Sequence, residues 1–292
     1  MIQTALPQLI PSVEVIDVVG VGGGCISEAF RVEVQEDFGK RVLFVKSNEL
    51  SFLDNFQTEQ DGLLRLGEPG VIGVPQPIAV GTALGRAWLV TEWVEQHRID
   101  AVFFSRFGTE LASLHQATLG DRIGLERDGY LGSADQLNGE CGTWPEFFAS
   151  RRIEFQIRRA VDQGLASRRL KDDCERIVVE MADLLDGRED RTSLLHGDLW
   201  SGNYLCSSEG QPVIFDPAAH FGCREAEFGM LQLFGSCSDD FYEAYQAAFP
   251  LPGGWQRRVR VYVLYHLLNH LNLFGVTYRG QCETVSAAIL RR

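Results

Sequence analysis

Short apolar runs around an acidic loop constrain the fold of this chain more than any other feature. The polar loop 196–203 lies between the apolar residues 194–195 and 204–205. A second apolar run, 212–215, ends abruptly on Asp216. Short apolar runs that are bounded by polar residues and glycines are typical of strands. We therefore expect short strands that hold the loop and Asp216 rigidly between them.

The spacing inside this loop is typical of phosphoryl transfer. Asp198 and Asn203 are five residues apart, as in the catalytic loops of kinases, where the Asp receives the proton of the acceptor hydroxyl and the Asn binds Mg²⁺. Asp216 stands where such enzymes have their main metal-binding Asp. Carboxylate and carboxamide oxygens suit Mg²⁺ when phosphates and waters complete its coordination. Because a lone loop Asp is usually a turn former, the assignment needs further parts upstream.

A glycine-rich turn follows the strand-like run 13–19 near the N-terminus. Glycines allow a tight turn and a close approach to phosphates. The turn lacks the third glycine of the dinucleotide fingerprint, and no Lys follows as in a P-loop, so a flexible hairpin turn is the alternative. If the turn covers phosphates, the residues that do so are Gly23, Gly24, Cys25, Ile26 and Ser27.

Lys46 and Glu59 are expected to form a buried ion pair. Lys46 ends the strand-like run 41–46. The preceding Asp37-Phe38-Gly39 matches the kinase D-F-G motif in sequence, but it lies between two strand-like runs, and we interpret it as a hairpin turn. Glu59 lies on the apolar stripe of a predicted helix over 52–66. A carboxylate that faces a core must be paired, and Lys46, which would bind the nucleotide phosphates, is the candidate partner.

The next strand, 87–91, leads into a predicted hinge. There the backbone of Glu92 and Val94, rather than their side chains, would bond an adenine. From about residue 99 the pattern becomes helical. We therefore predict a nucleotide-binding lobe over 1–94 and a catalytic, acceptor-binding lobe over 95–292.

The second lobe reads as helices joined by one long loop. The helical patterns cover 103–117, 144–165, 171–186, 225–234, 241–249 and 259–274, and the loop covers 120–142. His115 is expected to be a hydrogen-bonded core histidine. The paired arginines at 151–152, 158–159 and 257–258 are interpreted as solvated helix faces. Polar tips on the apolar helix 259–274 indicate either a substrate pocket or satisfied core hydroxyls.

Composition excludes several classes of function. The 292 residues carry a formal net charge of −13, which argues against nucleic-acid and anionic-membrane partners. No apolar run reaches the length of a membrane span, and no signal-peptide pattern is present, so we expect a cytoplasmic protein. The seven cysteines form no C-x-x-C pair and are expected to be reduced thiols.

The order of these parts is that of kinase-like phosphotransferases, and within them the chain resembles the fructosamine-3-kinase (ketosamine-3-kinase) family. The resembling runs are GGCISE at 23–28, FVK at 44–46, QLN at 136–138, WPEFF at 144–148, HGDLWSGN at 196–203, DPA at 216–218, LFG at 233–235 and NHLN at 269–272. The Trp200 step is the most specific part of this resemblance. The segment 120–137 and residues 224–227 match loosely.

The resemblance implies an α+β, two-lobed protein kinase-like fold, with a small antiparallel sheet and one main helix before a mostly helical lobe. It implies transfer of the ATP γ-phosphoryl, with Mg²⁺, to a hydroxyl of a ketosamine or glycated amine, the 3-hydroxyl of a fructosamine or ribulosamine adduct. Asp198 would be the base, Asn203 and Asp216 the metal ligands, and Trp200, Asn269 and His270 the acceptor contacts.

Several alternatives stay open from the sequence. Trp200 could serve packing alone, and Cys25 could be a redox-sensitive thiol or an inert one. The acceptor could be an aminoglycoside, choline or another amino alcohol, or the chain could be a nucleotide-binding pseudokinase. The chain could be a monomer or a homodimer.

Overall fold

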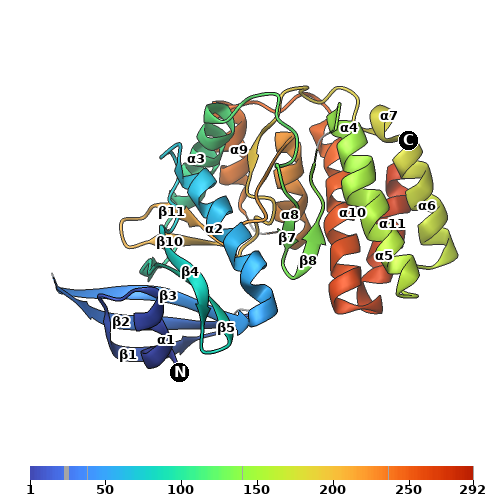
Figure 1. Cartoon of the computed structure of the whole chain (residues 1–292). Coiled ribbons are helices and arrows are strands. Elements are labelled where there is room, and N and C mark those ends of the chain that lie inside the picture. The colour runs from blue at the N-terminus through green and yellow to red at the C-terminus, as the bar shows by residue number, and fades with distance from the viewer. Residues whose placement is uncertain (23–25, 38, 140, 236, 292) are drawn as a thin grey trace.

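A sheet-rich N-terminal part packs against a mostly helical C-terminal part (Figure 1). The computed structural model describes residues 1–22, 26–37, 39–139, 141–235 and 237–291. This mixture of an antiparallel sheet and helices confirms the α+β class. The division into lobes at residue 94 stays a prediction. Among the described residues, no helix is both long enough and apolar enough to span a membrane.

The N-terminal part is a five-stranded antiparallel sheet in the order β1-β2-β3-β5-β4. Its strands are β1 (Glu14–Val21), β2 (Glu28–Glu36), β3 (Gly39–Glu49), β4 (Pro77–Ala83) and β5 (Arg86–Glu92). Apolar and polar residues alternate along β2 and β3, as expected for strands with two different faces. The strands predicted at 13–19, 41–46 and 87–91 are thereby confirmed, whereas β4 was not predicted.

Two helices cover opposite faces of this sheet. Helix α1 (Ile2–Leu9), which contains Pro7 and was not predicted, packs on the face of Val45 and Val90. Helix α2 (Leu53–Gly67) packs through Phe56 on the other face, where Leu89 lies. Lys46 is paired with Leu89 in the β3–β5 register, so its side chain lies on the same face as α2.

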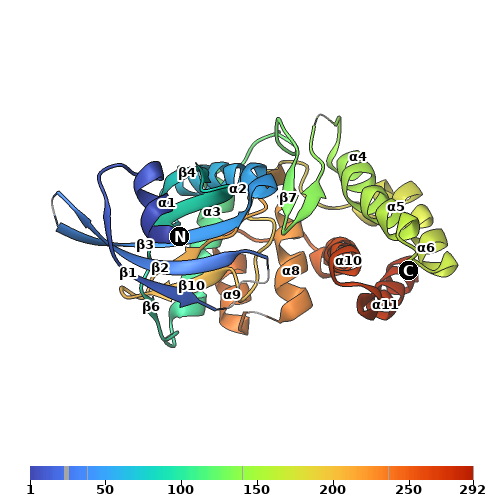
Figure 2. The same cartoon turned by 60° about the horizontal axis from the view of Figure 1, so that its bottom comes forward.

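The C-terminal part has one large core built from helices and short strands. Its helices are α3 (Phe103–Ala117), α4 (Trp144–Phe147), α5 (Phe155–Asp162), α6 (Arg168–Val179), α7 (Met181–Leu184), α8 (Glu227–Phe234), α9 (Asp239–Ala248), α10 (Trp255–Phe274) and α11 (Arg279–Leu290), with the π-helical segment Phe148–Glu154 between α4 and α5. Helices α5, α6, α10 and α11 lie together at the end away from the sheet (Figures 1 and 2).

Short strands hold the loops that face the N-terminal sheet. They are β6 (Gln96–His97), β7 (Gly129–Leu131), β8 (Ala134–Gln136), β9 (Ser193–Leu195), β10 (Tyr204–Ser207), β11 (Pro212–Ile214) and β12 (His220–Gly222). Strand β10 pairs with β6 and β11, and β9 pairs with β12, all antiparallel. The predicted strands on both sides of the loop 196–203 are therefore present.

Three expectations for this part were wrong. The segment 120–142 is not only a loop, because β7 and β8 form a hairpin in it. The helix predicted over 144–165 contains the π-helical segment and ends at Asp162. Arg152 and Arg258 are buried rather than solvated, at 0% and 2% exposure. Arg258 is neutralised by Glu225 at 2.6 Å, whereas Arg152 donates to carbonyl oxygens.

Candidate active site

The loop between β9 and β10 presents Asp198 and Asn203 together. The amide nitrogen of Asn203 donates to the backbone oxygen of Asp198 at 2.8 Å and to its Oδ2 at 3.1 Å. Both bonds use the NH₂ group of Asn203, so the amide oxygen takes no part in them. The five-residue spacing thus closes a small turn in which one side chain orients the other.

His196 joins this loop to the segment that carries Asp216. Its Nε2 lies 2.8 Å from the carbonyl oxygen of Phe215, and the backbone N–H of Asp198 donates to Nδ1 at 3.3 Å. Because Nδ1 accepts, the ring carries its proton on Nε2. Burial, partly opposed by nearby carboxylates, lowers the pKa of His196 and keeps the ring neutral.

Glycine is required at position 197. Gly197 has φ +80°, and a Cβ there would lie 2.3 Å from the carbonyl oxygen of Ala218. The close approach lets the loop 196–203 rest directly on the backbone after Asp216, where Ala218 N–H also bonds His196 O at 2.9 Å. A side chain would force these two segments apart.

A buried carboxylate that we did not predict, Glu227, supports the loop from behind. Its two oxygens accept the backbone N–H groups of His196 at 2.6 Å and Gly197 at 3.0 Å. Burial raises its pKa, but the combined effect of His115 and His196 outweighs burial and leaves the pKa lowered. The signal in the sequence was an acidic residue directly before the apolar run of α8. His115 is buried and bonded to Tyr245 at 2.8 Å, which confirms it as a core histidine.

Lys46, Glu59 and Asp216 form an ion triad between the sheet and the C-terminal part. The Nζ atom of Lys46 lies 2.7 Å from Oε1 of Glu59 and also bonds Oδ1 of Asp216. Burial lowers the pKa of Lys46, but the two carboxylates outweigh burial and raise it. Burial, reinforced by the charge of Asp216, raises the pKa of Glu59 to about 7 despite Lys46. The predicted pair is therefore present, with a second carboxylate on the lysine.

The carboxyl groups of this site stand in unusual environments. Asp216 has φ 57°, a left-handed conformation that non-glycine residues adopt rarely and mainly at functional sites. Burial, followed by the charge of Asp216, raises the pKa of Asp198 to about 7. A carboxylate with a pKa near neutrality is suited to accept a proton from a hydroxyl.

The end of the predicted phosphate loop is tied to the lysine strand. Asn48, two residues beyond Lys46 on β3, donates to the carbonyl oxygen of Ile26 at 3.1 Å and to Oγ of Ser27 at 3.0 Å. The predicted residues Gly23, Gly24 and Cys25 lie outside the described residues. Asn48 escaped the sequence reasoning, although a residue two positions from Lys46 on a strand shares its face.

Glu92 in the predicted hinge is bonded to Gln76, just before β4. The N–H of Glu92 donates to Gln76 O at 2.9 Å, and its Oε2 accepts Gln76 N–H at 3.2 Å. Trp93 packs against Phe44 with ring centroids 6.2 Å apart. Within the ranges that the structure describes, the N–H of Val94 donates to no backbone carbonyl, so it stays available to a ligand.

Aromatic rings extend from the catalytic loop along α10. Trp200 lies 5.4 Å from Phe234 between centroids, and Phe234 lies 5.5 Å from His270. Gly202 makes room for the indole, because a Cβ there would lie 2.4 Å from the Trp200 ring. Asn269, in contrast, is 2% exposed, and its Oδ1 accepts from Gln156 at 3.2 Å.

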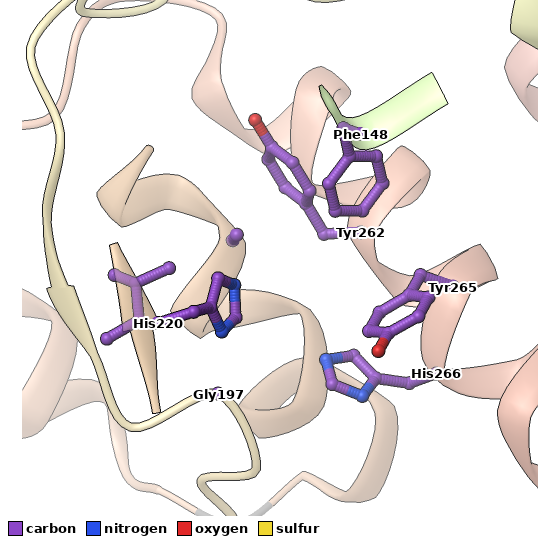
Figure 3. A pocket seen from close by; sticks show the side chains of 8 residues that line it. Phe148, Gly197, His220, Tyr262, Tyr265 and His266 are labelled. Atoms are coloured by element: carbon purple, nitrogen blue, oxygen red, sulfur yellow. The ribbon is translucent and has the colours of Figure 1, made fainter. Parts of the chain in front are cut away.

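Tyr262, Tyr265 and His266 of α10 line a small cavity behind the loop. Its volume is about 10 Å³, about that of one water molecule. The side chains of His220, Tyr265 and His266 point toward it (Figure 3). Its lining is Phe148, Leu195, Gly197, His220, Ala226, Tyr262, Tyr265 and His266. Burial, first among the causes, lowers the pKa of both histidines to about 3, so the wall behind Gly197 is uncharged.

The donor set suits a phosphate-bound Mg²⁺ rather than an all-protein metal site. Among the described residues, no group of three or more His, Cys, Asp and Glu could hold a metal ion by itself. The oxygens of Asp216 and Asn203 would supply few ligands, which is usual for Mg²⁺ that retains waters and phosphate oxygens.

Comparisons with known proteins identify relatives of this chain. The profile of the fructosamine kinase family matches residues 3–292. A protein of Synechocystis sp. that is assigned as a ketoamine kinase is 37% identical, over 93% of this chain and 89% of its own. The chloroplastic protein-ribulosamine 3-kinase of Oryza sativa subsp. indica is 35% identical, over 95% of this chain and 80% of its own.

Solved structures extend the similarity to the whole fold. A crystal structure assigned as a fructosamine-3-kinase from Thermobifida fusca has a TM-score of 0.85 and 34% identity, covering 98% of this chain and 97% of that one. Aminoglycoside phosphotransferase APH(4)-Ia, in complex with ADP and hygromycin B, has a TM-score of 0.67 and 16% identity, covering 95% and 94% of the two chains. At that identity the similarity shows the fold alone. The chain belongs to the fructosamine kinase family.

Proposed function

We propose that this chain transfers the γ-phosphoryl group of ATP to a sugar hydroxyl of a ketosamine, such as the 3-hydroxyl of a fructosamine or ribulosamine adduct. The observation that carries the proposal has two parts. The loop of Asp198 and Asn203 bonds Phe215, the residue before Asp216, and Asp216 in turn pairs with Lys46 from the other part of the chain. Membership of a family whose relatives include a protein-ribulosamine 3-kinase supports the acceptor class.

The base in this reaction is Asp198. It accepts the proton of the acceptor hydroxyl while that oxygen forms a bond to the γ-phosphorus and the bond to the β–γ bridging oxygen breaks, so that ADP leaves. The hydrogen bond from Asn203 at 3.1 Å holds the carboxylate in place. Since phosphoryl transfer depends mainly on positioning and charge neutralisation, a fixed carboxylate is the main protein contribution on the acceptor side.

On the nucleotide side, Lys46 binds the phosphates and Glu59 fixes Lys46. The loop 22–27 covers the phosphates, with Gly23, Gly24, Cys25, Ile26 and Ser27 as the predicted contacts. The backbone groups of Glu92 and Val94 bond the adenine. Asp216 and Asn203 would hold Mg²⁺, which when bound would supply positive charge to neutralise the transferring phosphoryl group.

On the acceptor side, the half-buried rings of Trp200 and His270, which both contact Phe234, are the proposed acceptor surface. Nδ1 of His270 bonds His266 O at 2.8 Å, which leaves Nε2 as an acceptor for a sugar hydroxyl or an ammonium group. Asn269 supports this helix through Gln156. A cytoplasmic location and a monomeric or homodimeric state stay predictions.

An acceptor panel with ATP and Mg²⁺ tests the proposal. We expect ADP release with fructosyl- and ribulosyl-amines, and a phosphorylated sugar in the product by mass spectrometry. The Asp198→Ala variant should lose turnover and still bind ADP. Turnover only with aminoglycosides or choline would favour a different amino-alcohol acceptor, and nucleotide binding without turnover on any acceptor would identify a pseudokinase.

A further inference from the structure

We infer that the β7–β8 hairpin is a strut between the acceptor-binding part and helix α2, and that Tyr130 is a positioning residue for Glu59. The hairpin lies beside α2 in both views of the fold (Figures 1 and 2). The inference rests on the proposed roles of Lys46 and Glu59, since α2 carries the carboxylate that holds the lysine.

The hairpin contacts α2 through its first turn. The hydroxyl of Tyr130 donates to Oδ2 of Asp54 at 2.9 Å, and Nη1 of Arg127 lies 3.3 Å from Oδ1 of the same residue. Burial, helped by the bond to Asp54, raises the pKa of Tyr130 to about 12, so the hydroxyl remains a donor. One turn further along α2, a Cβ at Gly129 would lie 3.1 Å from the methyl group of Thr58, the residue before Glu59.

The hairpin also reaches the end of the phosphate loop. A Cβ at Gly132, at its tip, would lie 3.1 Å from Cδ1 of Ile26 and 3.7 Å from Cδ1 of Leu273 on α10. One turn of β-structure therefore contacts α2, the phosphate loop and the helix that carries His270. These elements come from both parts of the chain, so the hairpin is placed to hold them in register.

The other side of the hairpin is fixed in the C-terminal core. The buried Arg152 donates to Leu137 O and to Oδ1 of Asn138 at 3.3 Å. Asn138 in turn bonds Arg127 O at 2.9 Å and, through its N–H, Oδ1 of Asp128 at 2.6 Å. Burial of a charged guanidinium is costly unless it is hydrogen-bonded. Here the guanidinium of Arg152 donates to residues at the base of the hairpin. Leu131 and Ala134 are buried at the turn.

Because its base is fixed in the C-terminal core and its other side contacts α2, the hairpin can hold α2, and with it Glu59, in place. If α2 moves away from the sheet, Oε1 of Glu59 leaves the 2.7 Å contact with Lys46, and the lysine is no longer fixed for phosphates. The Tyr130–Asp54 bond therefore stabilises the arrangement of the nucleotide site from the acceptor side.

A double-mutant cycle tests this inference. We expect Tyr130→Phe to lower kcat/KM for ATP about fivefold in the native background. In the Glu59→Gln background, where the pair is already broken, the same change should cost less than about twofold. Tyr242→Phe is the matched control. Tyr242 is a half-buried tyrosine on α9, which packs on α3, and the change should leave kcat/KM within about twofold of the native value.

Each outcome has a distinct meaning. An equal loss in both backgrounds would show that Tyr130 acts on stability alone and would overturn the strut. An impaired Glu59→Gln enzyme with an unaffected Tyr130→Phe enzyme would overturn the strut and leave the proposed function standing. An unimpaired Glu59→Gln enzyme would overturn the role of Glu59 and the strut with it. Asp54→Asn alone, which weakens the contacts of both Tyr130 and Arg127 with α2, should lower kcat/KM for ATP at least as much as Tyr130→Phe, and it serves as the second variant if Tyr130→Phe folds poorly.

Discussion

Nε2 of His196 donates a hydrogen bond of 2.8 Å to the carbonyl oxygen of Phe215, the residue directly before Asp216. One imidazole thereby sets the spacing between the proposed base and the proposed metal ligand. Asp198 follows His196 by two residues and bonds its Nδ1 through the backbone. Because burial lowers its pKa, the ring is neutral and has one donor and one acceptor nitrogen. We call this pair of bonds, which links the loop of Asp198 to Phe215, the bracket.

Replacing this ring should separate binding from turnover. We expect His196→Phe to lower kcat between about tenfold and a hundredfold, since small displacements of a base reduce phosphoryl transfer steeply, while KM for ATP changes little. Steady-state kinetics measures both constants. The exposed His97 on β6 offers the control His97→Phe. A His196→Phe enzyme with native kcat would contradict the bracket.

Gly197 and Gly85 make a matched pair for testing close approach. Both have positive φ, +80° and +73°, but a Cβ at Gly85 meets nothing within 4 Å, whereas at Gly197 it lies 2.3 Å from Ala218 O. Gly85→Ala should cost about 1 kcal/mol of unfolding free energy from backbone strain alone. Gly197→Ala should cost about 3 kcal/mol or more and abolish turnover. Urea unfolding measures the difference, and equal costs would disprove the argument.

The pH dependence of the reaction should follow the raised carboxyl pKa of Asp198. Burial and the charge of Asp216 raise it to about 7 from 3.8, so below pH 7 the group is protonated and cannot accept a proton. We expect kcat/KM for the acceptor to rise with pH below about 7, with a slope that approaches tenfold per pH unit at the acidic end, and then to level. A flat profile between pH 5 and 8 would contradict this assignment.

The raised pKa of Asp198 also makes the stability of the folded chain depend on pH. Because Asp198 binds its proton more tightly in the folded chain than in the unfolded one, its ionisation lowers the unfolding free energy as the pH rises from about 4 to about 7. Asp198→Asn removes this loss. The difference between the melting temperatures of the variant and the native protein should therefore shift in favour of the variant from pH 5 to pH 8. A difference that stays constant would argue against the raised pKa.

The sequence predicts best where chemistry requires a fixed order of residue types. Asp198 and Asn203 were proposed from their spacing, and Lys46, Glu59 and Asp216 from their places on a strand, a helix and an apolar run. The structure pairs the first two with each other and the other three in one triad. A carboxylate on the apolar stripe of α2 was a sufficient signal, because an unpaired charge there would be too costly.

The missed features depend on partners that are distant in sequence. Arg152 is buried because its donors reach the carbonyl of Leu137 and the side chain of Asn138, and no local pattern announces such acceptors. Glu227 binds backbone N–H groups. Almost every residue type has such a group, so the identity of the partner residue gives no signal in the sequence. The β7–β8 hairpin has three-residue strands, too short for a visible alternation.

Lys46 is the clearest test of the triad, because it is the only charge in it that opposes two carboxylates. Lys46→Met leaves Glu59 and Asp216 facing each other without a cation, which should cost about 3 kcal/mol of unfolding free energy near pH 8 and abolish ADP binding. Adding Glu59→Gln removes one of the two charges, so the double variant should be more stable than Lys46→Met alone while it still fails to bind ADP.

The control for this variant is a lysine in an ordinary surface pair. Lys40 contacts Glu33 at 2.8 Å with 63% of its side chain exposed, and such pairs contribute little because water and salt screen them. Lys40→Met should therefore leave the melting temperature and the ADP affinity unchanged. Calorimetry of all three variants with and without ADP gives both quantities. If Lys46→Met binds ADP as tightly as the native chain, the triad is a structural ion pair, and the phosphates of the nucleotide are held by other groups.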